Sequence, residues 1–291
     1  MDLHEYVWTY IINQLPKRRK TLTAPAHDAE RNLTGRRRRL PRFLAAACAA
    51  TVAGAAFGNL AVRADASDAN LWKSLFQGQV LLVGETHQRE GSLHLMRRVV
   101  EMTRATHACV TLAVEVAADQ QGALDRVVAG VASVQAVAVW DALDFPAYRV
   151  FLDEMLQLSA RAPCFRVVAA DLPVEVPGLR DEAMAKAVIE ASRTGAFVVG
   201  QFGALHTARG LRYSSAPEER NLADQLEAAA LEVWILGEHW SKSCKGTLSG
   251  PQSATAKAYA RDLGRIINGR ILGGLLADAV QSLCLPVNQT R

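Results

Sequence analysis

Five short apolar runs, separated by stretches with helical spacing, are the feature that most constrains this 291-residue chain. The apolar residues of each run are continuous instead of alternating, which is typical of a strand buried on both faces. The runs span residues 79–83, 109–114, 165–170, 196–200 and 232–236. The helical stretches span 90–107, 118–130, 146–161, 178–193 and 217–230. This alternation predicts an α/β fold with a mostly parallel central sheet of about five strands, flanked by helices on both faces.

The first 66 residues differ from the rest of the chain in charge. They hold 11 Lys and Arg against 5 Asp and Glu, so the total formal charge of +4 divides into +6 here and −2 in residues 67–291. Four arginines at 36–39 precede an uncharged stretch at 43–62 and an Ala-x-Ala sequence at 64–66. This order is typical of a secretory signal, and the uncharged stretch is also long enough for a membrane anchor. We therefore expect an exported protein, periplasmic or membrane-associated through residues 43–62.

These features divide the chain into four segments. Residues 1–35 form an N-terminal extension, for which a start site assigned too early is an alternative explanation. Residues 36–66 form the signal peptide or membrane anchor, 67–240 the α/β domain, and 241–291 a C-terminal loop and helical segment packing on that domain. Because the segment after the leader carries a net charge of −2, the usual electrostatic argument for nucleic acid is lost, and no nucleic-acid partner is expected.

The cysteines fit an oxidising compartment. Apart from Cys48 in the leader, the chain has an even number of them: Cys109, Cys164, Cys244 and Cys284. Cys109 and Cys164 each open a predicted strand, so they can lie on one edge of the sheet and pair. Buried free thiols are the alternative.

Polar side chains with catalytic or ligating chemistry follow every predicted strand. In chain order they are Glu85 with His87, Glu115, Asp171, His206, and Glu238 with His239. Because the carboxyl ends of parallel strands lie at one edge of a sheet, we expect these side chains to gather in one crevice. Glu115 is the clearest case, since a carboxylate between Val114 and Val116 needs a cation, a metal or a proton.

Imidazole and carboxylate groups together allow two kinds of chemistry. Glu85, His87, Glu115 and His206 could ligate a divalent metal such as Zn or Mn. The same residues could instead perform general acid–base catalysis without a metal. The sequence has no G-x-S-x-G elbow, no P-loop and no G-x-G-x-x-G after the first run, so serine-hydrolase, NTPase and dinucleotide-binding functions lose support.

Four motifs, in order and spacing, resemble the ChaN-type haem-binding uptake family. They are VLLVGETHQREGSLHLMRRVV, LAVEVAADQQGALDRVV, RDEAMAKAVIEA and FVVGQFGALHTARG, within residues 70–240. That family belongs to a larger group with erythromycin-esterase-like, TraB and Tiki proteins. The resemblance implies a parallel sheet between helices and a shared central pocket. The matching pocket positions are Glu85, His87, Glu115, Arg180, Asp181 and His206.

The resemblance implies an exported protein that binds haem or iron for uptake in the crevice lined by Glu85, His87, Glu115 and His206. If haem is the ligand, His94 and Tyr213 could be its axial donors, because imidazole and phenolate are usual in that role. A homodimer is a further expectation.

The alternative is a hydrolase acting on a small-molecule ester or a peptide, since erythromycin-esterase-like members open a macrolactone and Tiki members are metal-dependent proteases. Glu85 or His87 would then be the general base, and Glu115 would orient it or ligate a metal. His206 or Arg180 would stabilise developing negative charge. An interaction protein with an unused pocket is the third reading.

Overall fold

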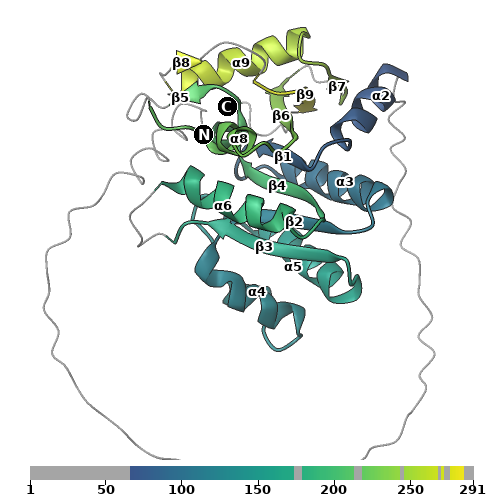
Figure 1. Ribbon diagram of the computed structural model, residues 1–291, viewed down its shortest axis with the longest axis vertical. Coiled ribbons are helices and arrows are strands. Elements are labelled where there is room, and N and C mark those ends of the chain that lie inside the picture. The colour runs from purple at the N-terminus through teal and green to yellow at the C-terminus, as the bar shows by residue number, and fades with distance from the viewer. Residues whose placement is uncertain are drawn as a thin grey trace, which may run out of the picture.

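The computed structural model describes residues 66–173, 179–212, 218–242, 246–267, 270–271 and 276–284. Nine strands lie in these ranges: β1 (Val80–Glu85), β2 (Val110–Ala117), β3 (Phe165–Asp171), β4 (Phe197–Gly203), β5 (Leu211–Arg212), β6 (Val233–Ser241), β7 (Leu248–Ser249), β8 (Arg270–Ile271) and β9 (Ala279–Cys284). Seven of them form one sheet in the order β3-β2-β4-β1-β6-β9-β7 (Figure 1). All neighbours pair in parallel except β7, which is antiparallel to β9. Strands β5 and β8 form a separate antiparallel pair.

Helices cover both faces of this sheet (Figure 1). The described α-helices are α2 (Ala66–Leu75), α3 (Glu90–Thr106), α4 (Gln121–Val128), α5 (Pro146–Arg161), α6 (Arg180–Ser192), α7 (Ala204–Thr207), α8 (Leu222–Ala228) and α9 (Ala254–Ile267), with short 3-10 turns at Ala118–Gln120 and Val134–Ala136. Helices α2 to α5 pack on one face, in a core with Leu81 and Val83. Helices α6, α8 and α9 pack on the other, with Val80 and Leu82. Successive residues of β1 thus enter opposite cores, and therefore the run is continuously apolar.

The expected fold class is confirmed, and the sheet is larger than expected. The five predicted strands correspond to β1, β2, β3, β4 and β6. A loop and helical segment were expected at 241–291, but this segment contains two strands of the sheet, where β9 pairs with β6 and β7 pairs with β9. These strands lie at the margin of the sheet, and β9 (AVQSLC) carries polar residues among the apolar ones, so it lacks the continuous apolar run of a central strand.

Several sequence expectations fall outside the described residues. These are the extension at 1–35, the signal or anchor except for Ala66, and Cys48, Cys244 and Tyr213. Among the described helices, none has the length and apolar character needed to cross a membrane.

A disulfide joins Cys109 to Cys164, the pairing that the strand positions had allowed. The two cysteines directly precede the register partners Val110 and Phe165 of the parallel strands β2 and β3. Cys284, at the end of β9, is disulfide-bonded as well. The Cys109–Cys164 bond therefore ties two strands together at the edge of the sheet where they begin.

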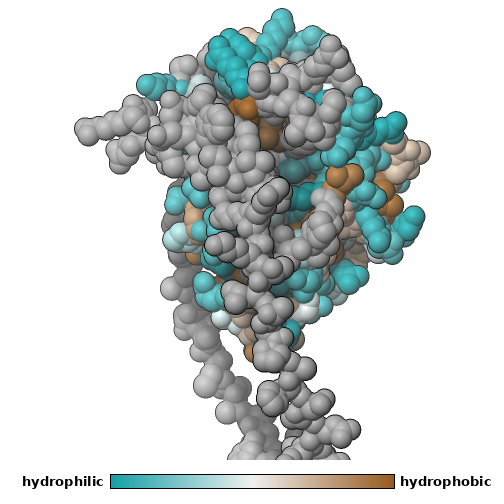
Figure 2. All heavy atoms as spheres, turned by 90° about the vertical axis from the view of Figure 1, so that its left-hand side faces the viewer, coloured by the Kyte–Doolittle hydropathy of each residue, from teal (hydrophilic) through white to brown (hydrophobic). Residues whose placement is uncertain are grey.

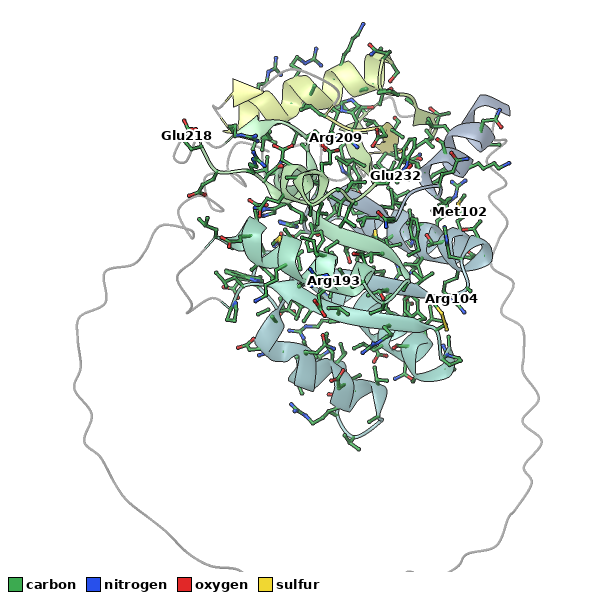
Figure 3. All side chains as sticks on the ribbon, in the orientation of Figure 1. Met102, Arg104, Arg193, Arg209, Glu218 and Glu232 are labelled. Carbon is green, nitrogen blue, oxygen red and sulfur yellow. A yellow bond between two sulfur atoms is a disulfide. The ribbon has the colours of Figure 1, made fainter. Side chains whose placement is uncertain are left out.

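The two ends of the parallel strands face opposite sides of the molecule. Figure 3 shows Arg104, which lies shortly before β2, and Glu232, which directly precedes β6, towards the right. Glu218, in the segment before α8, lies on the left. The carboxyl ends of the strands, where the sequence places its polar residues, therefore point to the left in Figures 1 and 3.

Candidate functional site

Glu85 and His87 form a buried carboxylate–imidazole pair at the end of β1. His87 Nδ1 lies 2.9 Å from Glu85 Oε1, and the two residues are 9% and 4% exposed. The other carboxylate oxygen, Oε2, accepts a hydrogen bond of 2.5 Å from Gln201 Nε2 on the adjacent strand β4. An ionised carboxylate only accepts hydrogen bonds, so Nδ1 carries the proton in this contact. Glu85 thus fixes the orientation of the His87 ring.

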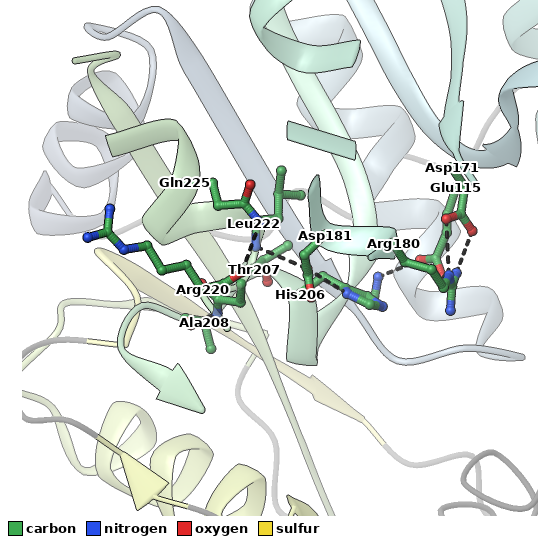
Figure 4. Close-up of polar contacts among 12 residues, drawn as sticks. Glu115, Asp171, Arg180, Asp181, His206, Thr207, Ala208, Arg220, Leu222 and Gln225 are labelled. Atoms are coloured by element: carbon green, nitrogen blue, oxygen red, sulfur yellow. Dashed lines mark hydrogen bonds and ion pairs between the residues drawn. The ribbon is translucent and has the colours of Figure 1, made fainter. Parts of the chain in front are cut away.

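Glu115 lies in a second polar group, which binds Arg180 (Figure 4). Its Oε1 accepts a hydrogen bond of 2.7 Å from Arg180 NH2, and its Oε2 accepts one of 2.8 Å from the backbone N–H of Gly203. The same guanidinium contacts both carboxylate oxygens of Asp171 at the end of β3. Arg180 also lies over the Trp140 ring, 4.5 Å from its centroid. The first residue of α6 therefore joins the ends of β2 and β3.

His206 forms the second carboxylate–imidazole pair, with Asp181 (Figure 4). His206 Nδ1 lies 2.8 Å from Asp181 Oδ1, and that oxygen also accepts the backbone N–H of Leu222 at 3.0 Å. His206 is in the short helix α7, directly after β4, and Asp181 is the second residue of α6. The α6 start therefore holds Glu115 with one residue and His206 with the next.

Gly203 brings the two imidazoles together. A Cβ atom at this position would lie 3.1 Å from His87 Cε1 and Nε2, and 3.6 Å from His206 Cδ2. Both rings therefore contact the space beside the Gly203 α-carbon, and a larger residue would crowd them. The backbone N–H of the same glycine holds Glu115. The spatial convergence expected of Glu85, His87, Glu115 and His206 is thus present, although they come from three different strand ends.

The charges in this cluster keep Glu115 ionised and favour protonated imidazoles. Burial disfavours the Glu115 carboxylate, but His87, Arg180 and His206 outweigh it and lower its pKa to about 2. Burial also opposes charging of His87, yet the hydrogen bond to Glu85 and the charge of Glu115 raise the pKa of that ring. The pKa of His206 is raised against burial in the same way, by Asp181 and Glu115.

Glu238, at the end of β6, is held by different partners. Its Oε2 accepts hydrogen bonds from Ser92 Oγ at 2.6 Å, the Thr86 N–H at 3.1 Å and Trp240 Nε1 at 3.3 Å. Its Oε1 is buried and has no hydrogen-bond partner within the described ranges. Burial raises its pKa to about 8, with Glu85 adding to the effect. Glu238 thus anchors the loop between Glu85 and His87 through Thr86.

Other residues singled out by sequence lie away from this arrangement. His94 is exposed on α3, in contrast to the buried rings of His87 and His206. His239 lies 3.4 Å from Asp262 of α9. The sequence offered both His94 and the half-buried His239 as candidates, and neither contacts the four central residues through a described hydrogen bond.

Two residues at the site had no catalytic signal in the sequence. Gln201 sits inside an apolar strand and could have been found as a polar residue at a buried position. Trp140 lies in the loop before α5 and resembles an ordinary core residue in sequence. Its contact with Arg180 appears only in three dimensions.

The cluster does not fit a metal centre. Within the parts of the chain that the structure describes, no group of three or more His, Cys, Asp or Glu could hold a metal ion. Glu85 directs one oxygen to His87 and one to Gln201, and Glu115 directs its two to Arg180 and Gly203. Their oxygens serve internal hydrogen bonds, so the metal set expected from sequence lacks support.

A cleft of about 530 Å³ adjoins the cluster, between the start of α6 and helix α8. Its lining is mostly charged: Leu179, Arg180, Asp181, Glu182, Glu218, Glu219, Arg220, Gln225, Ala228 and Ala229. Figure 2 looks onto this side of the molecule, where the coloured residues are largely hydrophilic with small hydrophobic patches between them. Because Arg180 and Asp181 line the cleft and also hold Glu115 and His206, the cleft borders the buried cluster.

No protein-family profile and no curated protein matches this sequence. Several solved structures overlap with it in part, among them the following three. The ChaN of Campylobacter jejuni, which binds haem cofacially, is 10% identical with a TM-score of 0.42, over 62% of this chain and 88% of that one. The type III effector HopBA1 is 14% identical with a TM-score of 0.45, over 73% and 90%. RRSP, a MARTX toxin effector domain from Vibrio vulnificus, is 18% identical with a TM-score of 0.38, over 60% and 36%. The relation of this chain to the ChaN-type family therefore rests on the resemblance of sequence motifs.

Proposed function

We propose that this protein is a hydrolase that uses general acid–base catalysis at the buried cluster. The observation that supports it best is the placement of two imidazoles, each held by a carboxylate, on either side of Gly203. In a carboxylate–imidazole pair of this kind Nε2 is the proton-transfer atom, and the carboxylate stabilises the imidazolium that forms. Two such pairs side by side provide a base and an acid for one substrate.

Each residue of the cluster has its own role in the proposed reaction. His87, oriented by Glu85, removes a proton from water through Nε2 while the water oxygen bonds to the substrate carbonyl carbon. His206, held by Asp181, donates a proton to the leaving group as the acyl bond breaks. Glu115 stays ionised and favours the protonated form of both rings. Arg180 contacts two carboxylates, Glu115 and Asp171, so we assign it a positioning role.

The dependence of activity on pH should reflect the titration of two imidazoles. Both His87 and His206 have a pKa raised above the ordinary value of 6.5. Activity should rise with pH as His87 loses its proton and fall again as His206 loses its own. The optimum is therefore expected on the alkaline side of pH 6.5.

Hydrolysis of p-nitrophenyl acetate and of a fluorogenic peptide amide by the full chain tests this proposal. His87→Ala and Glu115→Gln should each lose about 100-fold or more in kcat. His107→Gln is the matched control, because that ring bonds the Phe76 carbonyl and stacks on Phe197 at the opposite edge of the sheet, so its activity should stay within about twofold of the parent. A His87→Ala protein as active as its parent would reject the proposal. Loss of activity with EDTA, restored by Zn²⁺, would favour the metal alternative.

Haem binding is the second candidate. The sequence resemblance supports it, and His94 offers an exposed imidazole on α3 that a bound haem could reach. Titration of the full chain with hemin should then produce a Soret band that shifts in His94→Ala and in Tyr213→Phe. A spectrum unchanged in both variants would exclude these donors. Export of the chain and its association with a membrane or a second copy stay predictions.

A further inference from the structure

The hydroxyl group of Tyr148 is buried beside the cluster and has no hydrogen-bond partner among the described residues. The residue lies in the first turn of α5, is 1% exposed, and packs its ring against Phe145 and Phe151. Its hydroxyl has no hydrogen-bond partner in the described part of the chain. Buried hydroxyl groups are normally hydrogen-bonded, and leaving one unpaired destabilises the folded state. This group therefore needs an explanation.

The surroundings of Tyr148 connect it to the site. Burial raises the pKa of this phenol well above its ordinary value, and the negative charges of Glu85, Glu115 and Asp171 add to the effect. These three carboxylates stand at the ends of β1, β2 and β3. Tyr148 thus stays protonated throughout the neutral range, and a protonated phenol is a hydrogen-bond donor.

Two further polar atoms at the cluster are buried without a partner among the described residues, Trp140 Nε1 and Gln201 Oε1. Trp140 lies against Arg180, and Gln201 holds Glu85 through its other amide atom. Because Glu85 can only accept, the amide nitrogen of Gln201 is fixed towards it and the oxygen faces away. Two donors and one acceptor are thus buried without described partners beside the same charged cluster.

We propose that the Tyr148 hydroxyl is a further catalytic residue, which donates a hydrogen bond to the carbonyl oxygen of the substrate. This rests on the hydrolase function proposed above. As water bonds to the carbonyl carbon, the carbonyl π electrons move to oxygen, and the phenol stabilises the resulting negative charge while keeping its own proton. A hydroxyl held ready for that charge is unpaired before substrate binds.

Tyr259 provides the comparison that separates this role from ordinary burial. It is 3% exposed on α9 and packs against Gly237 on the other face of the sheet, and its hydroxyl bonds the Thr207 side chain. Removal of the Tyr148 hydroxyl should relieve the cost of an unpaired buried group, whereas removal of the Tyr259 hydroxyl takes away a contact with Thr207. Only removal of the Tyr148 hydroxyl should affect catalysis.

The experiment compares Tyr148→Phe and Tyr259→Phe in the full chain, with p-nitrophenyl acetate and the fluorogenic peptide amide as probes. We expect kcat to fall at least about tenfold in Tyr148→Phe and to stay within about twofold in Tyr259→Phe. The melting temperature of Tyr148→Phe should equal or exceed that of the parent, because no hydrogen bond of the described residues is lost. Equal kcat in Tyr148→Phe and parent would overturn the inference.

A second readout keeps the two proposals apart. If the parent hydrolyses neither probe, the hydrolase proposal fails, while the melting temperatures still test the unpaired hydroxyl. A Tyr148→Phe protein that melts clearly below the parent would overturn the inference, because its hydroxyl would then already serve a partner within the protein.

Discussion

Glu115 and Glu238 are buried to the same degree at the same edge of one sheet, and they differ in charge state. Their exposed fractions are 3% and 4%. Glu115 has a pKa of about 2, whereas Glu238 has one of about 8. At neutral pH the first is therefore an anion and the second mostly a neutral acid.

The partners explain the difference. Glu115 contacts Arg180 directly and lies near His87 and His206, so three cations stabilise its charge against burial. Glu238 receives hydrogen bonds from the neutral groups of Ser92, Thr86 and Trp240, and lies near the like charge of Glu85. Burial alone thus does not determine whether a carboxyl group at this edge is ionised. The presence of a cation within hydrogen-bond distance decides it.

Replacing Arg180 should have the largest effect on the free energy of unfolding. Arg180→Met leaves Glu115 and Asp171 as buried carboxylates without their counter-charge, so we expect the free energy of unfolding at pH 7 to fall by about 3–5 kcal/mol. Urea denaturation followed by circular dichroism measures this. Arg193→Met is the control, since that guanidinium pairs with Glu190 on the surface and should change stability by less than about 0.5 kcal/mol. Equal losses in the two variants would contradict the role given to Arg180.

Replacing Glu238 by glutamine should have an intermediate effect on the free energy of unfolding, of opposite sign. Glu238 has a raised pKa, so the folded state keeps a proton that the unfolded state releases between pH 4.5 and about 8. Stability of the parent should therefore fall across that window, and Glu238→Gln should remove the fall. At pH 8 we expect the variant to be more stable than the parent by on the order of 2 kcal/mol, because the new amide N–H₂ is itself left unpaired and offsets part of the gain.

Unfolding curves at pH 4.5, 6 and 8 would measure the Glu238 effect. The same difference between parent and variant at all three values would show that Glu238 does not titrate in this range. Glu115→Gln serves as the comparison, since the Glu115 carboxyl is ionised at all three values and is protonated only as the pH falls below 4.5 towards about 2.

The sequence predicted which residues reach this edge and could not predict which of them pair. Continuous apolar runs indicate parallel strands, and the ends of such strands share an edge, which placed Glu85, Glu115 and Glu238 correctly. The order β3-β2-β4-β1-β6, in which Glu115 meets Arg180 and Glu238 meets α3, depends on how the connecting helices cross the sheet. Tyr148 lies in an amphipathic helix among aromatic residues, so its pattern is that of a core position.

The smallest effect on stability is expected for Gly203→Ala, a change that keeps the backbone hydrogen bond to Glu115 but crowds the His87 ring. Gly203→Ala keeps the backbone N–H that Glu115 accepts, and the φ of −55° and ψ of 143° suit alanine. The free energy of unfolding should change by less than about 1 kcal/mol, because the entropy gained from losing a glycine offsets the crowding. The new Cβ would nevertheless lie 3.1 Å from the His87 ring, so the ring must shift and kcat should fall about tenfold. NMR titration of His87 would follow that shift, and unaltered kcat with an unaltered titration curve would show that Gly203 does not control the imidazole.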